Sequence, residues 1–291
     1  MSRVRDLAIV SVVGRDQKGI VARVSTYLAG CNTNIEDIEQ RVMEGLFIMT
    51  MLVDVTDLSA SLDAMILGLK QIGEEMHVEV SVRLHSARER KRVAILVTKE
   101  PHCLEGLLEE HGADRINGDL VVVLSNHEVL QPLAERHGIP FHAYPSADKA
   151  AHEAFLIERL REARPDLIVL ARYMQVLSGE MVGRYPNRII NIHPSLLPYH
   201  PGGNAYKQAY EEGVRVSGCT AHFVTEQLDQ GPVILQDVFH IRVGEDTLEE
   251  VRQRGKSLEA KVLSQAVQLF LNEQLVVADK KVLFRPGRLP Q

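Results

Sequence analysis

Apolar and polar positions over residues 1–85 alternate in a pattern typical of a small α/β domain. Two stretches carry apolar residues at helical spacing, and four shorter runs read as strands separated by polar or glycine-containing turns. The resulting order β-α-β-β-α-β is the split βαβ arrangement of a ferredoxin-like domain. The predicted strands cover residues 7–13, 35–43, 47–55 and 77–84, and the predicted helices cover 20–30 and 58–73.

Beyond residue 91 the pattern changes to short buried strands that alternate with longer amphipathic helices. This alternation predicts a Rossmann-like, mostly parallel sheet wrapped by helices, with an antiparallel end. The predicted strands cover 93–97, 120–124, 139–143, 167–170, 189–192, 218–224 and 233–243, and the predicted helices cover 104–111, 128–137, 149–163, 205–212 and 247–272, before a hairpin over 276–284. We therefore expect an α/β protein with domains over 1–85 and 92–291, joined by a linker over 86–91.

Composition narrows the class of protein. A formal charge of −6 argues against a general nucleic-acid partner, and no run of apolar residues is long enough to cross a membrane. The start has no long apolar run of the kind that directs secretion, and the three cysteines are few and odd in number. Cys219 and His222 have a C-x-x-H spacing, but no second ligand pair accompanies them. We expect a cytoplasmic protein without bound metal.

The segment around Asn191 and His193 carries the strongest candidate chemistry. The two residues lie at the end of a predicted buried strand, and their spacing places both side chains on the same side of it. Pro194 and Pro198 then stop the strand and prevent an immediate helix. An amide beside an imidazole can polarise a carbonyl and transfer a proton. The alternative is a strand-end histidine with only a structural hydrogen bond.

The region after residue 218 gives this segment a context. A polar-interrupted strand over 218–224 leads into a turn that contains Asp229, and a second strand follows. Together with the Asn-x-His segment, this resembles the folate-dependent formyltransferase family, whose catalytic asparagine, histidine and aspartate match Asn191, His193 and Asp229. The resemblance implies that Asn191 donates to a developing oxyanion, His193 shuttles the proton and Asp229 orients the imidazole.

The same resemblance implies two walls for a folate site. One is the loop after the strand over 167–170, which meets the pterin in relatives, and the other precedes Asp229. Main-chain groups and apolar side chains suit a flat pterin. The alternative is that Met174, Val176 and Leu177 are only core residues, but the resemblance favours the pocket. The implied folate-binding residues are Arg172, Tyr173, Met174, Gln175, Val176, Leu177, Thr225, Glu226, Gln227 and Leu228.

The first domain, with its glycines between residues 14 and 19 and its Asn-x-Asn before Ile35, resembles an ACT domain. ACT domains commonly pair and bind small amino acids near the first strand-to-helix turn, where free amides can hold a carboxylate. The resemblance implies an effector such as glycine or methionine near Gly14, Gly19, Ile20 and Asn34, and a homodimer or homotetramer. The alternative is a domain that only dimerises.

The loop over 97–103 bears on the formyl acceptor. Transformylases that use a ribonucleotide carry a glycine-rich phosphate cradle there, whereas this loop has no glycine, Pro101 lacks an N–H and Glu100 would repel a phosphate. With the ACT domain, it resembles formyltetrahydrofolate deformylases, although Pro194 stands where many of these have a second histidine. The resemblance implies hydrolysis of 10-formyltetrahydrofolate to formate and tetrahydrofolate without a cofactor, which would supply formate for purine synthesis. The alternatives are a formyltransferase to an unidentified amine and an inactive regulatory protein that binds amino acids and folate.

Overall fold

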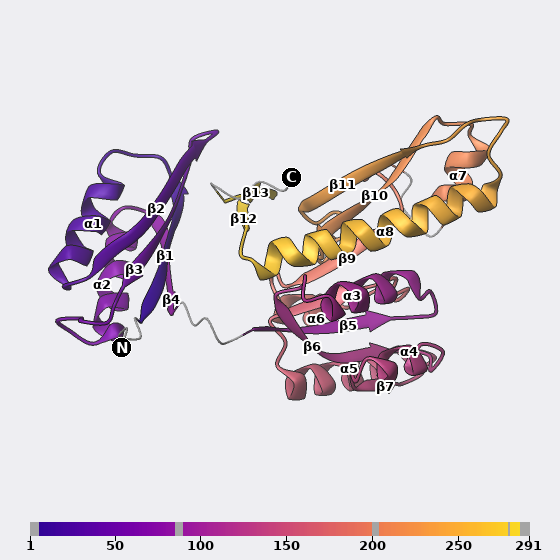
Figure 1. Cartoon of the computed structure of the whole chain (residues 1–291), viewed down its shortest axis with the longest axis horizontal. Helices are drawn as coiled ribbons and strands as arrows, with labels where there is room; N and C mark the ends of the chain where they lie inside the picture. The colour runs from indigo at the N-terminus through magenta and orange to yellow at the C-terminus, as the bar shows by residue number, and fades with distance from the viewer. Residues whose placement is uncertain (1–5, 85–89, 200–203, 279, 286–291) are drawn as a thin grey trace. The chain divides into compact units, whose positions relative to one another are not determined.

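The chain divides into two compact units in a computed structural model that describes residues 6–84, 90–199, 204–278 and 280–285 (Figure 1). One unit comprises Met1–Glu89 with Phe284–Gln291, and the other comprises Arg90–Leu283. Most of the linker expected over 86–91 lies outside the described residues, and the first strand of the second unit already begins at Lys91.

The first unit has the predicted β-α-β-β-α-β order. Its four antiparallel strands lie in the order β2-β3-β1-β4, with α1 and α2 packed on one face. Alternate residues such as Val10 and Met49 point into a core with Leu28 of α1 and Leu69 of α2, because side chains of a strand alternate between its faces. The elements are β1 (Leu7–Arg15), α1 (Ile20–Gly30), β2 (Asn34–Met43), β3 (Leu46–Asp54), α2 (Leu62–Glu75) and β4 (Val78–Leu84).

The second unit contains a seven-stranded sheet in the order β11-β10-β9-β8-β5-β6-β7. The strands from β9 to β7 are parallel, whereas β10 and β11 are antiparallel to their neighbours, which confirms the predicted mixed sheet. The strands are β5 (Lys91–Val97), β6 (Gly118–Ser125), β7 (Phe141–Ala143), β8 (Leu167–Leu170), β9 (Ile189–His193), β10 (Val216–Phe223) and β11 (Val233–His240). A separate hairpin is formed by β12 (Leu275–Ala278) and β13 (Lys281–Phe284), and the last residue of β13 is grouped with the first unit.

Helices cover the sheet through apolar stripes. Leu156 and Leu160 of α5 and Met181 of α6 share one buried cluster with strand residues such as Leu96. On α3, Gly106 allows close approach to Ala260 of α8, and α8 packs along β9, β10 and β11. The helices are α3 (His102–Gly112), α4 (Gln131–Arg136), α5 (Lys149–Ala163), α6 (Gly179–Arg184), α7 (Ala205–Glu211) and α8 (Leu248–Leu271).

Several predicted boundaries were wrong. Helix α2 begins at Leu62 instead of residue 58, because the Ser61 side chain caps it by accepting from the Ala64 N–H at 3.2 Å. Helix α4 is shorter than predicted, and β11 ends at His240 before the turn at Gly244, whose φ is +89°. The six-residue helix α6 was not predicted at all.

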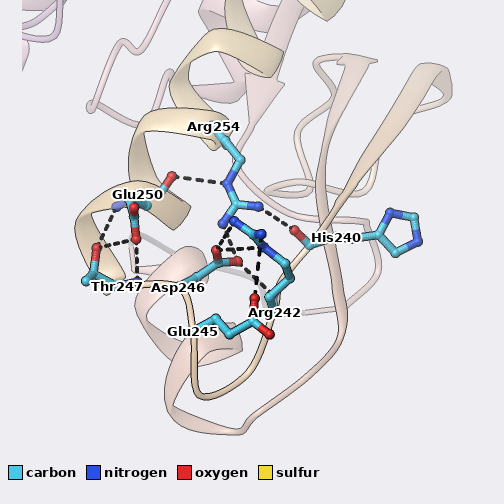
Figure 2. A network of polar contacts seen from close by, with 7 residues as sticks. All are labelled: His240, Arg242, Glu245, Asp246, Thr247, Glu250 and Arg254. Carbon is cyan, nitrogen blue, oxygen red and sulfur yellow. Dashed lines mark hydrogen bonds and ion pairs between the residues drawn. The ribbon is translucent and has the colours of Figure 1, made fainter.

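The start of α8 is fixed by a polar network (Figure 2). Thr247 and Glu250 form a capping box, in which the Thr247 N–H donates to Glu250 Oε2 at 2.7 Å and the Glu250 N–H donates to Thr247 Oγ1 at 3.3 Å. The buried carboxylate of Asp246 pairs with the guanidinium groups of Arg242 and Arg254. These two arginines hold the pKa of Asp246 below its usual value, with Arg254 contributing most. The network connects the segment that follows β11 to the first turns of α8.

The strand order places a switch point between β5 and β8. The chain moves from β5 to β6 and β7 on one side and then returns to β8 and β9 on the other. Ligands of open α/β sheets bind at such a point, outside the carboxyl ends of the strands. Within the described residues, no helix combines the length and apolar character needed to cross a membrane. Cys31, Cys103 and Cys219 are buried free thiols.

Candidate active site

Asn191 and His193 project from the carboxyl end of β9. The strand pairs with β8 in parallel and with β10 in antiparallel register, so its end is held on both sides. Alternation along the strand places both side chains on one face, as predicted. His193 is only 5% exposed, whereas Asn191 is half-buried. An imidazole and a primary amide therefore share one sheltered edge of the sheet.

Asp229 reaches the same place from the turn between β10 and β11. Its backbone lies in the left-handed region, with a φ of +53°, which turns the chain sharply and directs the carboxylate back to β9. Asp229 Oδ2 lies 3.3 Å from His193 Nδ1, and the carboxylate is 13% exposed. The structure thus brings the three predicted catalytic residues together.

These residues line one cavity of about 200 Å³. The loop that follows β8 forms one wall, and the segment before Asp229 forms another. Gln227 does not line the cavity, and its carbonyl instead accepts from Thr225 Oγ1 at 3.1 Å within the turn. The other predicted folate residues that line it are Arg172, Tyr173, Met174, Gln175, Val176, Leu177, Thr225, Glu226 and Leu228.

The loop after β8 is fixed in position by hydrogen bonds to α5 and to Thr98, which directly follows β5. His152 of α5 is buried, and its Nδ1 lies 2.7 Å from the Tyr144 carbonyl. A carbonyl only accepts, so Nδ1 donates and Nε2 is left to accept from the Tyr173 hydroxyl. Burial lowers the pKa of His152, which favours this neutral form. On the β5 side, the Met174 N–H donates to Thr98 Oγ1 at 3.0 Å.

A buried charged cluster, formed by Glu259, Arg172 and His102, adjoins the cavity. The Glu259 carboxylate on α8 is 1% exposed, and its Oε2 lies 3.1 Å from His102 Nε2 and 3.5 Å from Arg172 Nε. Arg172 has a left-handed backbone conformation, with a φ of +60°. Its ion pair with Glu259 links this residue of the loop to α8. The sequence offered no signal for this cluster, because Glu259 lies in an ordinary helical pattern.

Metal binding at this cluster is disfavoured. His102, Cys103 and Glu259 place their ligand atoms within 4.8 Å of one another. However, the Arg172 guanidinium already supplies positive charge to Glu259, and burial raises the pKa of the Cys103 thiol. A thiol must be deprotonated to bind a metal, so these groups suit a buried ion pair better than a cation site.

His222 is a further site residue, which sequence reasoning considered only as a zinc ligand. It lies opposite Asn191 in the β9–β10 register and lines the same cavity. Its Nε2 lies 3.2 Å from Asn191 Nδ2 and 3.8 Å from Asp229 Oδ1. Burial lowers the pKa of His222. The alternation of side chains along β10 would have placed His222 on the same face as Asn191, if the pairing of β10 with β9 had been known from the sequence.

The loop over 98–101 contains an ion pair in place of a phosphate cradle. Glu100 Oε2 lies 2.8 Å from Lys256 Nζ of α8, and this partner lowers the pKa of Glu100. Pro101 forms the N-cap of α3 and has no N–H to offer.

The structure gives the four predicted effector residues of the first unit different surroundings. Gly19 lines a groove between α1 and α2, but the lining of that groove does not include Gly14, Ile20 or Asn34. A Cβ at Gly14 would lie 2.6 Å from Val78 Cγ1, so close packing accounts for that glycine. Gly19 has a φ of +95°, which the turn into α1 requires. Ile20 is buried, and Asn34 Nδ2 donates to Glu36 Oε1 at 2.9 Å.

Comparison with known proteins covers both units. The profile of the formyl transferase family matches residues 91–267, and that of the ACT domain matches residues 6–83. The chain is 39% identical over 274 residues to a formyltetrahydrofolate deformylase of Bacillus subtilis (strain 168), which covers 92% of this chain and 90% of that protein.

Two solved structures are similar to different extents of the chain. A formyltetrahydrofolate deformylase from Pseudomonas syringae pv. tomato superposes with a TM-score of 0.87 and 32% identity, over 98% of this chain and 95% of that one. Glycinamide ribonucleotide transformylase 1 from Symbiobacterium toebii gives a TM-score of 0.65 and 37% identity, over 70% of this chain and 98% of that one.

Proposed function

The chain belongs to the formyl transferase family, and we propose that it is a formyltetrahydrofolate deformylase, which hydrolyses 10-formyltetrahydrofolate to formate and tetrahydrofolate. The observation that carries the proposal is the meeting of Asn191, His193 and Asp229 at one cavity. Similarity along nearly the whole chain to proteins named for this activity supports it.

The arrangement of the three residues supports a mechanism by general acid–base catalysis. His193 takes a proton from water as the water oxygen attacks the formyl carbon, and the Asn191 N–H stabilises the oxyanion that develops. Asp229 holds the imidazole through Nδ1 and stabilises its charged form. When the C–N bond breaks, His193 returns the proton to the departing nitrogen of tetrahydrofolate. Formic acid is left, and it loses its remaining acidic proton to solvent to give formate. The substrate supplies the formyl group, so we expect no cofactor.

Water as the acceptor is supported by the loop after β5. Pro101 contributes no N–H there, and the Glu100 carboxylate, which pairs with Lys256, would repel a phosphate. A phosphate at this loop would therefore meet a carboxylate instead of the free N–H groups of a glycine-rich turn.

A second candidate is formyl transfer to an amine. A cavity of about 290 Å³ shares Arg172 and Pro194 with the catalytic cavity and is lined by further cations, including Lys207 and Arg252. An acceptor could lie there beside the formyl group. This candidate predicts slow formate release from 10-formyltetrahydrofolate alone and acceleration by the correct amine.

The deciding experiment supplies purified protein with 10-formyltetrahydrofolate and no amine, and follows formate and tetrahydrofolate together. Release of both in equal amounts, lost in a His193→Asn variant, supports the hydrolase. Folate binding without release contradicts hydrolysis and favours the transferase or an inactive regulatory protein.

For the ACT domain we propose binding of a small amino acid, with glycine or methionine as the candidates, within a homodimer or homotetramer. Such gating would match formate supply for purine synthesis to one-carbon status. Thermal unfolding and formate release should both shift with glycine or methionine but not with leucine as the control. Light scattering distinguishes the two assemblies, and no shift with either amino acid contradicts the effector proposal.

A further inference from the structure

The pairing of β9 with β10 places His222 directly across from Asn191. Residues paired across antiparallel strands project to the same face, so both side chains line the catalytic cavity. The β10–β11 register shifts between Ala221 and His222, and such irregularities redirect side chains beside active sites. His222 is 2% exposed and has no role in the mechanism described above.

The hydrogen bonds of His222 define its tautomer. Nδ1 lies 2.9 Å from the Phe223 carbonyl oxygen, which can only accept, so Nδ1 carries the proton. In the neutral ring, Nε2 then has a lone pair and can only accept. Nε2 lies 3.2 Å from Asn191 Nδ2, so the Asn191 amide must donate there. This contact also assigns the amide: an Asn191 flipped to present Oδ1 would set two acceptors against each other.

We infer that His222 is a positioning residue, which accepts one N–H of Asn191 and thereby fixes the second N–H toward the formyl oxygen. The inference rests on the proposed function for the identity of that oxygen. A primary amide can exchange the positions of its oxygen and its NH2 group by a half turn, because the two groups are similar in size. The bond to Nε2 removes that freedom, and a donor fixed before the reaction stabilises an oxyanion more than one that must reorient.

The groups around His222 agree with this role. Asp229 Oδ1 lies 3.8 Å from Nε2, and His193 approaches the same carboxylate through Oδ2. Protonation of His222 would turn Nε2 into a donor and require Asn191 to present its oxygen. The catalytic donor would then be lost. Burial opposes that protonation by lowering the pKa of His222, while Asp229 acts in the opposite direction.

Two substitutions of similar length isolate the acceptor. His222→Gln can place an amide oxygen near the position of Nε2, whereas His222→Met fills a similar space without a comparable acceptor. We expect His222→Met to lower kcat by about ten- to a hundredfold with KM changed by less than about threefold, and His222→Gln to retain most of kcat. Equal losses in the two variants would overturn the inference, since the imidazole itself would then be required.

A double-mutant cycle with Asn191→Ala distinguishes positioning from a separate role. His222→Met should have no further effect on single-turnover rates once Asn191 is absent. A full additional loss in that background contradicts the inference, because His222 would then act independently of Asn191. Affinity for tetrahydrofolate, the product, reports whether each variant still forms the site, and only variants that bind it enter the cycle.

Nitrogen-15 chemical shifts of the histidines test the tautomer without any assay of activity. The imidazole signal that is lost in His222→Gln should come from a ring that is protonated at Nδ1 and unprotonated at Nε2. A proton on Nε2 would overturn the inference. If the wild-type protein bound folate but released no formate, the proposed hydrolysis would fail, while this measurement would still decide the tautomer of His222 on which its pairing with Asn191 depends.

Discussion

His193 Nδ1 faces Asp229 Oδ2 at 3.3 Å across the end of the central sheet. The two residues come from different elements, β9 and the turn after β10, so the contact depends on the fold instead of local sequence. A carboxylate in this position fixes the ring and stabilises the charged imidazole that forms as the proton is taken.

Replacing either residue with asparagine should remove most of the activity. His193→Asn deletes the proton acceptor, and Asp229→Asn deletes the charge that stabilises the imidazolium while keeping nearly the same shape. We expect kcat for formate release to fall by roughly a hundredfold or more in each variant. Glu180→Gln removes an exposed carboxylate of the same unit that pairs with Arg184, and it should leave kcat nearly unchanged. Turnover like that of the wild type in either catalytic variant would refute the assigned roles.

The buried carboxylate of Glu259 should contribute strongly to stability. It is 1% exposed and neutralises Arg172 while it accepts from His102. Glu259→Gln leaves the Arg172 charge without its counter-ion, and removal of one partner from a buried ion pair costs about 3–5 kcal/mol. We expect a loss near the lower end of that range, because glutamine can still form a hydrogen bond. Urea unfolding followed by circular dichroism measures the change.

An exposed pair provides the control for Glu259. Glu211 lies 3.6 Å from Lys207 Nζ on α7 and is 61% exposed, so Glu211→Gln should change the free energy of unfolding by less than about 0.5 kcal/mol. Equal effects of Glu211→Gln and Glu259→Gln would contradict a structural role for the buried cluster.

Two buried histidines make stability depend on pH. Burial lowers the pKa of His152 and His222 in the folded protein, whereas unfolding restores their ordinary value of about 6.5. Below that pH, the unfolded chain binds protons that the folded chain does not, so the free energy of unfolding should fall as pH decreases from about 6.5 to 5.5. Each histidine can contribute a slope of at most about 1.4 kcal/mol per pH unit.

His152→Gln should flatten this slope. Tyr173→Phe is the matched control, because it removes the hydroxyl that donates to His152 but keeps the titrating imidazole. The phenylalanine variant should be less stable at every pH with a slope close to that of the wild type. Urea unfolding at a series of pH values measures both slopes, and an unchanged slope in His152→Gln would contradict the prediction.

Local pattern predicted most of the fold and the position of the catalytic strand. Alternation and proline placement were enough to put Asn191 and His193 side by side at a strand end, because these signals act within a few residues. Helix α6 was missed because six residues hardly establish a period, although Ser178 is a suitable N-cap and accepts from the Met181 N–H at 3.1 Å.

Contacts across the fold could not be predicted in the same way. The approach of His222 to Asn191 depends on the β9–β10 register, and the pairing of Arg172 with Glu259 depends on where α8 lies against the loop after β8. Neither contact produces a periodic pattern of residues that can be recognised in a single sequence. The resemblance to a family identified Asp229 as a partner of His193, but it did not indicate which residues hold that set in place.

Close packing requires a glycine at position 231, and the same packing fixes the turn that carries Asp229. A Cβ at this position would lie 1.7 Å from the Phe223 carbonyl oxygen, a backbone atom that cannot move without disturbing β10. The next residue, Pro232, accepts from the Phe223 N–H at 2.9 Å, so the turn that carries Asp229 is anchored at this point.

Gly231→Ala should therefore move the Asp229 turn away from His193. We expect kcat for formate release to fall by roughly a hundredfold, comparable to the loss of a catalytic group, with an accompanying loss of thermal stability. Gly183→Ala is the control, because a Cβ there meets no atom within 4 Å and alanine is favoured over glycine inside a helix by up to about 1 kcal/mol. That variant should match or slightly exceed the wild type in stability at unchanged turnover. Full activity in Gly231→Ala would mean that the turn tolerates a side chain, and the position of Asp229 would then not depend on this close approach.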